Sequence, residues 1–138
     1  PDVEYAEALV DGFAMKLMMD PWRYDVVVTT NQFGDILTDQ GAGLVGGLGL
    51  APGLCIGESR AMAQATHGSA PDIYGKKIAN AIGQIWAGAM MLDHLGCPEA
   101  GAAVVKAIEN VLQEGPKTPD LGGKASTSDL GKAVVEAL

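Results

Sequence analysis

Residues 24–39 read Tyr-Asp-Val-Val-Val-Thr-Thr-Asn-Gln-Phe-Gly-Asp-Ile-Leu-Thr-Asp, and this stretch decides the fold. Its first half, from Tyr24 to Thr30, is a β-branched run typical of a strand that is buried on both faces. A helix should follow near Gly34 and carry Asp35 and Asp39 about one turn apart. The stretch therefore predicts a strand leading into a helix with two carboxylates on one face.

Two interpretations fit the pair Asp35 and Asp39. Carboxylate oxygens are ligands that Mg²⁺ and Mn²⁺ prefer, with waters or substrate oxygens completing the coordination sphere. Acidic residues near the start of a helix also complement the helix dipole, and acidic pairs four residues apart are common on exposed helical faces. Spacing alone leaves both a metal site and a solvated helix start open.

Composition limits the classes of function. The chain has 138 residues, 48% of them hydrophobic, which is enough for one domain with a core. The formal net charge of −8 argues against nucleic acid or an anionic membrane as the main partner. Cys55 and Cys97 form no CxxC pair and suggest no disulfide framework, as in a reducing cytosol, so we expect a cytoplasmic protein.

Apolar spacing outlines the other elements of the N-terminal part. Residues 2–19 carry apolar side chains at helical intervals, which predicts an amphipathic helix that ends at Asp20-Pro21. Seven glycines fall within residues 41–57 and predict close backbone approach in a tightly packed crossover between two lobes.

The C-terminal part reads as three helices. Asn80 is a suitable N-cap for the first of them, and Gly96 is its expected stop. The second runs from about Glu99 to Glu114. Ser126 or Ser128 should cap the last, whose inward side chains are expected to be Leu130, Val134, Val135 and Leu138. The pattern as a whole is mixed α/β with more helix than strand.

Three segments, taken in order, resemble one family. Besides residues 24–39, they are His67-Gly-Ser-Ala-Pro-Asp-Ile-Tyr-Gly-Lys-Lys-Ile-Ala-Asn80 and Thr118-Pro-Asp-Leu-Gly-Gly123. Together they are similar to motifs of the β-decarboxylating dehydrogenases, which include isocitrate, 3-isopropylmalate, homoisocitrate and tartrate dehydrogenases. The resemblance implies an α/β fold, the C-terminal part of the two-lobed isocitrate/isopropylmalate dehydrogenase-like fold. Residues 1–45 would end the small, dimer-forming lobe, and residues 46–138 would complete the large lobe.

The resemblance also implies a metal site. Asp35 and Asp39 match the two metal-binding aspartates of one subunit, and Asp11 matches a third that reaches the same metal from the other subunit. Mg²⁺ or Mn²⁺ would bind there, in a homodimer with shared active sites. Taken alone, Asp11 would be read as a surface residue of a helix.

The second motif resembles the family's loop for the adenosine half of the cofactor. Asp72 would accept hydrogen bonds from a ribose 2′-hydroxyl and repel a 2′-phosphate, so NAD is favoured. Lys76 and Lys77 lie nearby and keep NADP open. The residues expected to bind the cofactor are His67, Gly68, Ser69, Ala70, Pro71, Asp72, Ile73 and Asn80.

The activity implied is metal-dependent oxidative decarboxylation of a 2-hydroxy acid with a β-carboxylate, of the isocitrate, 3-isopropylmalate or tartrate type. The family's catalytic tyrosine and lysine and its substrate arginines are expected upstream, so no catalytic residue is assigned in this chain. The alternatives are a non-catalytic regulatory or binding subunit, and an inactive fragment of such an enzyme. By itself the chain should expose strand edges and apolar faces, and become ordered only with further chain or a second copy.

Overall fold

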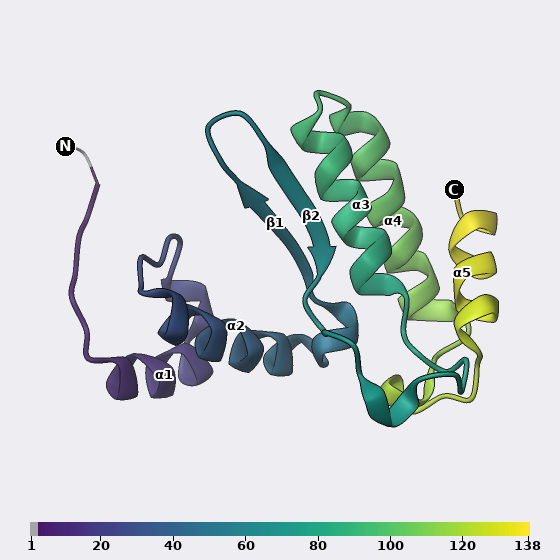
Figure 1. Cartoon of the computed structure of the whole chain (residues 1–138), viewed down its shortest axis with the longest axis horizontal. Helices are drawn as coiled ribbons and strands as arrows, with labels where there is room; N and C mark the ends of the chain where they lie inside the picture. Colours follow the sequence, from purple (N-terminus) through teal and green to yellow (C-terminus); the bar gives the residue numbers. More distant parts are fainter. Residues whose placement is uncertain (1–2) are drawn as a thin grey trace. The chain divides into compact units, whose positions relative to one another are not determined.

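The computed structural model of the protein describes residues 3–138, which form two compact units. The first unit ends at Val45, and the second is Gly46–Leu138 (Figure 1). Their assignment to the small and large lobes of a longer protein stays a prediction.

Two helices make up most of the first unit. Gln40 ties them together, because its Nε2 donates a hydrogen bond of 2.8 Å to the carbonyl of Ala14. The rings of Phe13 and Tyr24 also meet edge to face, with centroids 4.8 Å apart. In chain order the elements are α1 (Val10–Met19), the 3₁₀ turn η1 (Pro21–Arg23) and α2 (Asn31–Val45).

The strand predicted for residues 24–30 is wrong, because this segment has no regular structure. Val26 is 81% exposed and Val28 is 93% exposed. A strand needs a neighbour to pair with its backbone N–H and C=O groups, and no other strand pairs with this segment in residues 3–138. Residues 26–30 are therefore exposed to solvent instead of being buried in a sheet.

Both helix starts predicted for this unit are corrected as well. The helix expected over residues 2–19 begins only at Val10, and Asp2 lies outside the described residues. Tyr5 and Leu9 are exposed, so no packing supports a longer helix there. The helix expected near Gly34 begins at Asn31, and the amide of Gly34 already donates to the carbonyl of Thr30 at 2.9 Å.

The second unit begins with an antiparallel hairpin that the sequence did not predict. Its strands are β1 (Pro52–Ile56) and β2 (Ala61–Ala65), in a register that runs from Pro52 opposite Ala65 to Ile56 opposite Ala61. The amide of Gly57 donates to the carbonyl of Arg60 at 2.8 Å and closes the turn. Part of the glycine-rich segment predicted as a crossover is therefore a strand.

Helices complete the second unit, and α3 lies at its centre. The hairpin packs against α3, α3 packs against α4, and α4 packs against α5 (Figure 1). The core formed between them contains Leu50, Ile82, Ala107, Ile108, Val111, Leu130 and Val134. The elements are α3 (Ile82–His94), α4 (Pro98–Glu114) and α5 (Thr127–Glu136), with the 3₁₀ turns η2 (Leu48–Leu50), η3 (Pro71–Ile73) and η4 (Pro119–Leu121).

Local start and stop signals of these helices are confirmed. Gly96 follows α3 with a φ of +84°, a conformation that glycine adopts without a steric penalty. Ser126 caps α5 in a capping box with Asp129. That carboxylate accepts hydrogen bonds from the amide and hydroxyl of Ser126, which lower the pKa of Asp129.

The inward face predicted for the last helix is only half right. Leu130 and Val134 are buried in the core, as expected. Val135 is 70% exposed and Leu138 is 67% exposed. In a helix of 3.6 residues per turn, positions 130 and 134 share a face that position 135 leaves. None of the helices in residues 3–138 is long and apolar enough to cross a membrane.

Substitution by alanine is expected to have opposite effects on the free energy of unfolding at two glycines that lie in helices. A Cβ at Gly101 would lie 2.9 Å from the backbone oxygen of Ala89, where α3 and α4 meet, whereas a Cβ at Gly131 would meet nothing within 4 Å. We expect Gly101→Ala to lower the free energy of unfolding by about 1–3 kcal/mol through overpacking. Gly131→Ala should raise it by up to about 1 kcal/mol through helix propensity.

Thermal unfolding of the full-length protein, followed by calorimetry, measures both changes. Equal effects of the two substitutions would contradict the close approach of α3 and α4 at Gly101.

Candidate functional site

The two aspartates of α2 lie on one exposed face of this helix. Asp35 and Asp39 are one turn apart in this helix, and both side chains are exposed. The hydroxyl between them, Thr38 Oγ1, donates back to the carbonyls of Gly34 and Asp35 at 2.9 and 3.2 Å. Thr38 therefore does not donate a hydrogen bond to either carboxylate, and both carboxylates remain available to a ligand.

Neither carboxylate has a cationic partner in residues 3–138, where the ion pair found joins Lys106 to Glu109. The same residues hold no group of three acidic, histidine or cysteine side chains placed to bind a metal. Two carboxylates supply only part of the shell of about six oxygens that Mg²⁺ requires. Asp35 and Asp39 can therefore be one side of a metal site, and the other ligands must come from outside this arrangement.

Asp11, the third predicted metal ligand, lies in the first turn of α1. Its side chain is exposed, and Oδ1 accepts a hydrogen bond of 2.7 Å from the amide of Gly12. This contact uses one lone pair of one oxygen and leaves the rest of the carboxylate free. The structure does not bring Asp11 into a cluster with the aspartates of α2.

The predicted cofactor loop joins β2 to α3 and has an unusual backbone. Among residues 3–138, two residues other than glycine have a positive φ, and both are in this loop: Ala70 at 42° and Lys77 at 57°. Gly68 and Gly75 add further positive φ values of 63° and 76°. The left-handed conformation costs a residue with a Cβ about 1–2 kcal/mol. Such strain concentrates at binding sites.

The tip of the loop presents its side chains to solvent. His67 Nδ1 lies 2.8 Å from the carbonyl of Gly68, and because a carbonyl only accepts, this nitrogen is the donor. Ser69 and Asp72 are exposed, while Ala70 and Ile73 are half-buried. Asp72 stands in the first turn of η3, where Pro71 begins the turn. The loop therefore offers a ligand the carboxylate of Asp72 as an acceptor and the exposed imidazole of His67.

Asn80, at the end of the loop, is only 6% exposed, and both ends of its amide are engaged. Its Oδ1 accepts a hydrogen bond of 2.9 Å from the amide of Ile82, the first residue of α3, but the N-cap position is Ala81, so the predicted N-cap is off by one residue. Its Nδ2 donates to Asp120 Oδ2 at 2.9 Å. One hydrogen and one lone pair of the amide remain for a ligand.

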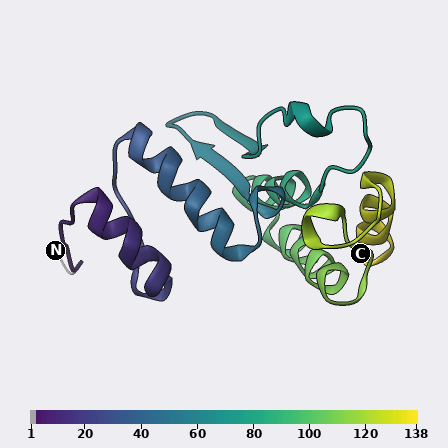
Figure 2. The same cartoon turned by 90° about the horizontal axis from the view of Figure 1, so that it is seen from below.

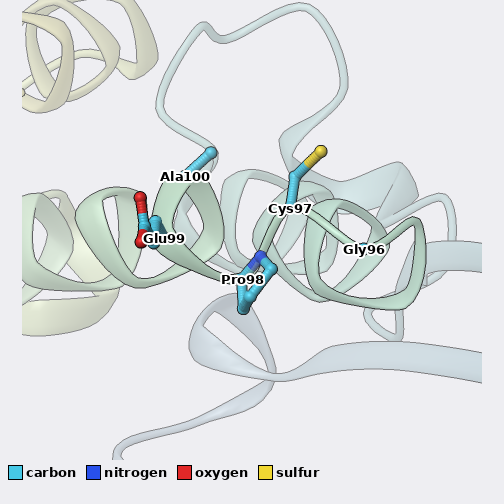
Figure 3. A pocket seen from close by; sticks show the side chains of 5 residues that line it. All are labelled: Gly96, Cys97, Pro98, Glu99 and Ala100. Carbon is cyan, nitrogen blue, oxygen red and sulfur yellow. The ribbon is translucent and has the colours of Figure 1, made fainter.

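The second unit also has a concave surface at the turn between α3 and α4. It is lined by five consecutive residues, Gly96 to Ala100. Figure 3 shows the side chains of Cys97, Pro98 and Glu99 pointing away from one another. No two polar groups converge there, so this hollow is a weaker candidate than the loop.

Comparison with known proteins places the chain in a family. The sequence profile of the family described as isocitrate/isopropylmalate dehydrogenase matches residues 1–134. The chain belongs to the isocitrate/isopropylmalate dehydrogenase family. The predicted family is thereby confirmed.

Individual members of the isocitrate/isopropylmalate dehydrogenase family are similar over the whole chain. Isocitrate/homoisocitrate dehydrogenase of Thermus thermophilus is 56% identical over 138 residues, which are 100% of this chain and 41% of that protein. 3-Isopropylmalate dehydrogenase of Archaeoglobus fulgidus is 48% identical over 138 residues, 100% of this chain and 42% of that protein. The chain thus spans about two fifths of the length of these relatives.

A solved structure from the isocitrate/isopropylmalate dehydrogenase family confirms the fold class. The crystal structure of isocitrate dehydrogenase from Methylococcus capsulatus has a TM-score of 0.96 and 48% sequence identity with this chain. The match covers 99% of this chain and 41% of that one. The structure described here is therefore part of an isocitrate dehydrogenase-like α/β fold.

Sequence reasoning missed two residues that contact the loop from the C-terminal segment, Asp120 and Thr127. The hydroxyl of Thr127 donates to the carbonyl of Ala79 at 2.6 Å, and its amide donates to the carbonyl of Lys77 at 3.0 Å. The end of the loop lies beside the start of α5 in both views (Figures 1 and 2). The family-like segment Thr118–Gly123 was the available signal, but a contact across 40 residues leaves no local pattern.

Because the amide of Asn80 is buried and hydrogen-bonded, we expect its loss to destabilise the fold more than the loss of an exposed asparagine. Asn80→Ala leaves the amide of Ile82 without its acceptor and Asp120 without its donor, so we expect the free energy of unfolding to fall by about 1–3 kcal/mol. Asn110, an exposed residue of α4, is the matched control, and Asn110→Ala should change it by less than about 0.5 kcal/mol. Calorimetric unfolding of the full-length protein compares them. Similar losses from both would contradict the buried role of Asn80.

Proposed function

We propose that this chain is part of an enzyme that oxidises and decarboxylates a 2-hydroxy acid bearing a β-carboxylate, with a divalent metal ion and with NAD as hydride acceptor. The observation that carries the proposal is the pair Asp35 and Asp39, exposed on one face of α2 and free of cationic partners within residues 3–138. Membership of the isocitrate/isopropylmalate dehydrogenase family supports it.

The donor set fits Mg²⁺ or Mn²⁺. Both ions are hard and prefer carboxylate and water oxygens, and Asp35 and Asp39 offer such oxygens without competing hydrogen bonds from Thr38. Asp11 is proposed as a third ligand, given by the other subunit of a homodimer. An incomplete pair on α2 and an exposed carboxylate on α1 support this sharing, because neither helix alone supplies a full coordination shell.

The role of the aspartates in the reaction follows from their charge. A divalent ion, when bound, supplies Lewis-acid stabilisation of the negative charge that develops on the substrate oxygen as CO₂ is lost. Three carboxylates would hold such an ion and leave its remaining positions to the hydroxyl and carboxylate oxygens of the substrate. The residues that move the proton are proposed to lie in parts of the protein other than residues 3–138.

The loop from His67 to Asn80 is proposed to bind the adenosine half of the cofactor. Two of its four positive φ angles belong to residues with a Cβ, Ala70 and Lys77, and strained backbone of this kind concentrates at binding sites. Asp72 is exposed and is a carboxylate, which accepts hydrogen bonds from ribose hydroxyls and repels a 2′-phosphate. NAD is therefore favoured over NADP.

The hydroxy acid itself is left as a class. The two relatives compared above are named for different substrates, isocitrate and homoisocitrate in one case and 3-isopropylmalate in the other. The decisive assay follows NAD reduction at 340 nm by the full-length protein with Mn²⁺ and isocitrate, homoisocitrate, 3-isopropylmalate, tartrate or D-malate. Binding of Mn²⁺ and NAD without turnover of any of them would favour a non-catalytic subunit.

The metal assignment predicts the effect of a single oxygen-to-nitrogen change. Asp39→Asn removes a charged ligand, so we expect Mn²⁺-dependent turnover to fall at least about 100-fold and the Kd for Mn²⁺ to rise. Asp20→Asn is the matched control in the same unit, because Asp20 is also exposed and follows α1. Titration with Mn²⁺ and initial rates measure both variants. Full activity of Asp39→Asn would remove the metal assignment.

The cofactor assignment predicts a change of preference. Asp72→Lys replaces repulsion of a 2′-phosphate by attraction, and we expect the ratio of kcat/KM for NAD to kcat/KM for NADP to fall at least about tenfold. Glu58→Lys, in the exposed turn of the hairpin, makes the same change of charge away from the loop and should leave the ratio unaltered. An equal shift in both variants would point to the overall charge of the protein instead of Asp72.

A further inference from the structure

A hydrogen bond across 40 residues connects the loop to the C-terminal segment. Nδ2 of Asn80, which is 6% exposed, donates to Oδ2 of Asp120 at 2.9 Å, while its Oδ1 faces the amide of Ile82. Asp120 stands on η4, in a turn that begins at Pro119. The contact is charge-assisted, because an ionised carboxylate accepts from the amide.

This contact allows the Asn80 amide a single orientation. If the amide turned over, its NH₂ group would face the amide hydrogen of Ile82, and its oxygen would face the carboxylate of Asp120. Both contacts would then be repulsive, whereas both are attractive as observed. The unused hydrogen and lone pair of Asn80 therefore have fixed directions, as recognition of a base edge by an amide requires.

The surroundings hold both partners in place. A Cβ at Gly49, on η2, would lie 2.8 Å from Asp120 Oδ2 and 2.9 Å from the Cβ of Asn80, so the backbone closes directly over the pair. Thr127 holds the end of the loop through hydrogen bonds to the carbonyls of Lys77 and Ala79. Lys77 is one of the strained residues, with a φ of 57°. Such a conformation persists only where the neighbouring structure enforces it.

We propose that Asp120 is a positioning residue that orients the Asn80 amide for the adenosine half of the cofactor. The proposal rests on the proposed function, since it assumes that the loop from His67 to Asn80 binds NAD. Asp120 acts through Asn80 and needs no contact of its own with the nucleotide. Its segment thereby links cofactor affinity to the C-terminal helix α5.

The test compares three substitutions in the full-length protein. Asp120→Ala removes the acceptor, and Asp120→Asn keeps an oxygen acceptor of the same size. Asp93→Ala removes an exposed carboxylate at the far end of α3 and is the matched control. Ile108→Val, in the core, is the control for general loss of stability, because it removes one methylene without touching Asn80.

Hydrogen exchange measures how firmly Asp120 holds the loop when no cofactor is present. Asp120→Ala should accelerate amide exchange in peptides covering residues 66–82 about tenfold, since the loop loses a charge-assisted hydrogen bond. Calorimetric titration should then show a Kd for NAD raised about tenfold. The KM for the hydroxy acid should change less than about twofold, because that ligand does not meet the loop. Asp120→Asn should restore exchange and affinity to within about threefold, and Asp93→Ala should leave both unchanged.

Three results would overturn the proposal. The first is unchanged exchange in Asp120→Ala, and the second is faster exchange with an unaltered Kd for NAD, which would make Asp120 merely structural. The third is an equal rise of the Kd in Ile108→Val. If the unsubstituted protein fails to bind NAD, it is the proposed cofactor that is wrong, and faster exchange in Asp120→Ala then shows only that Asp120 stabilises the loop.

Discussion

The second unit depends on the burial of α3. Ile82, at its first turn, is completely buried, and Ala87 and Ala89 leave little more surface to solvent. The hairpin covers one part of this helix and α4 another, and the backbone oxygens of Gly49 and Ala51 lie so near Gly83 that no side chain fits between them. Small residues on α3 thus set the distances at which its neighbours pack, and the loop that precedes it inherits a fixed end point at Asn80.

The carboxylates proposed to bind the metal ion and the cofactor are exposed, in contrast to the buried helix α3. Asp35, Asp39 and Asp72 are exposed, and they are distributed over both units. Burial fixes the elements that carry them, while the carboxylates themselves keep their solvation until a ligand replaces it. Asn80 is the exception, because it is buried and pays for desolvation with two hydrogen bonds. It is therefore both part of the scaffold and part of the candidate site.

Sequence reasoning succeeded where the determining interactions are local. The cap at Ser126, one of the two serines predicted for it, and the glycine stop at Gly96 need only neighbouring residues, and both were predicted. The strand expected at residues 24–30 failed because pairing depends on a partner that is remote in sequence. The hairpin was missed because its two short strands contain only one β-branched residue, Ile56, and three alanines, so their composition does not favour a strand. For the site, sequence gave the exposed aspartates and the loop, but Asp120 and Thr127 act across 40 and 48 residues.

The exposed run Val26 to Thr30 has a consequence for aggregation of the chain before folding is complete. It combines three valines and two threonines without charge, proline or glycine, the composition of segments that stack into cross-β aggregates. Asp25 sets a negative charge at its start, in the manner of a gatekeeper residue. Until another segment covers this run, it can pair with strand edges of other chains, so aggregation competes with the folding of a newly made chain.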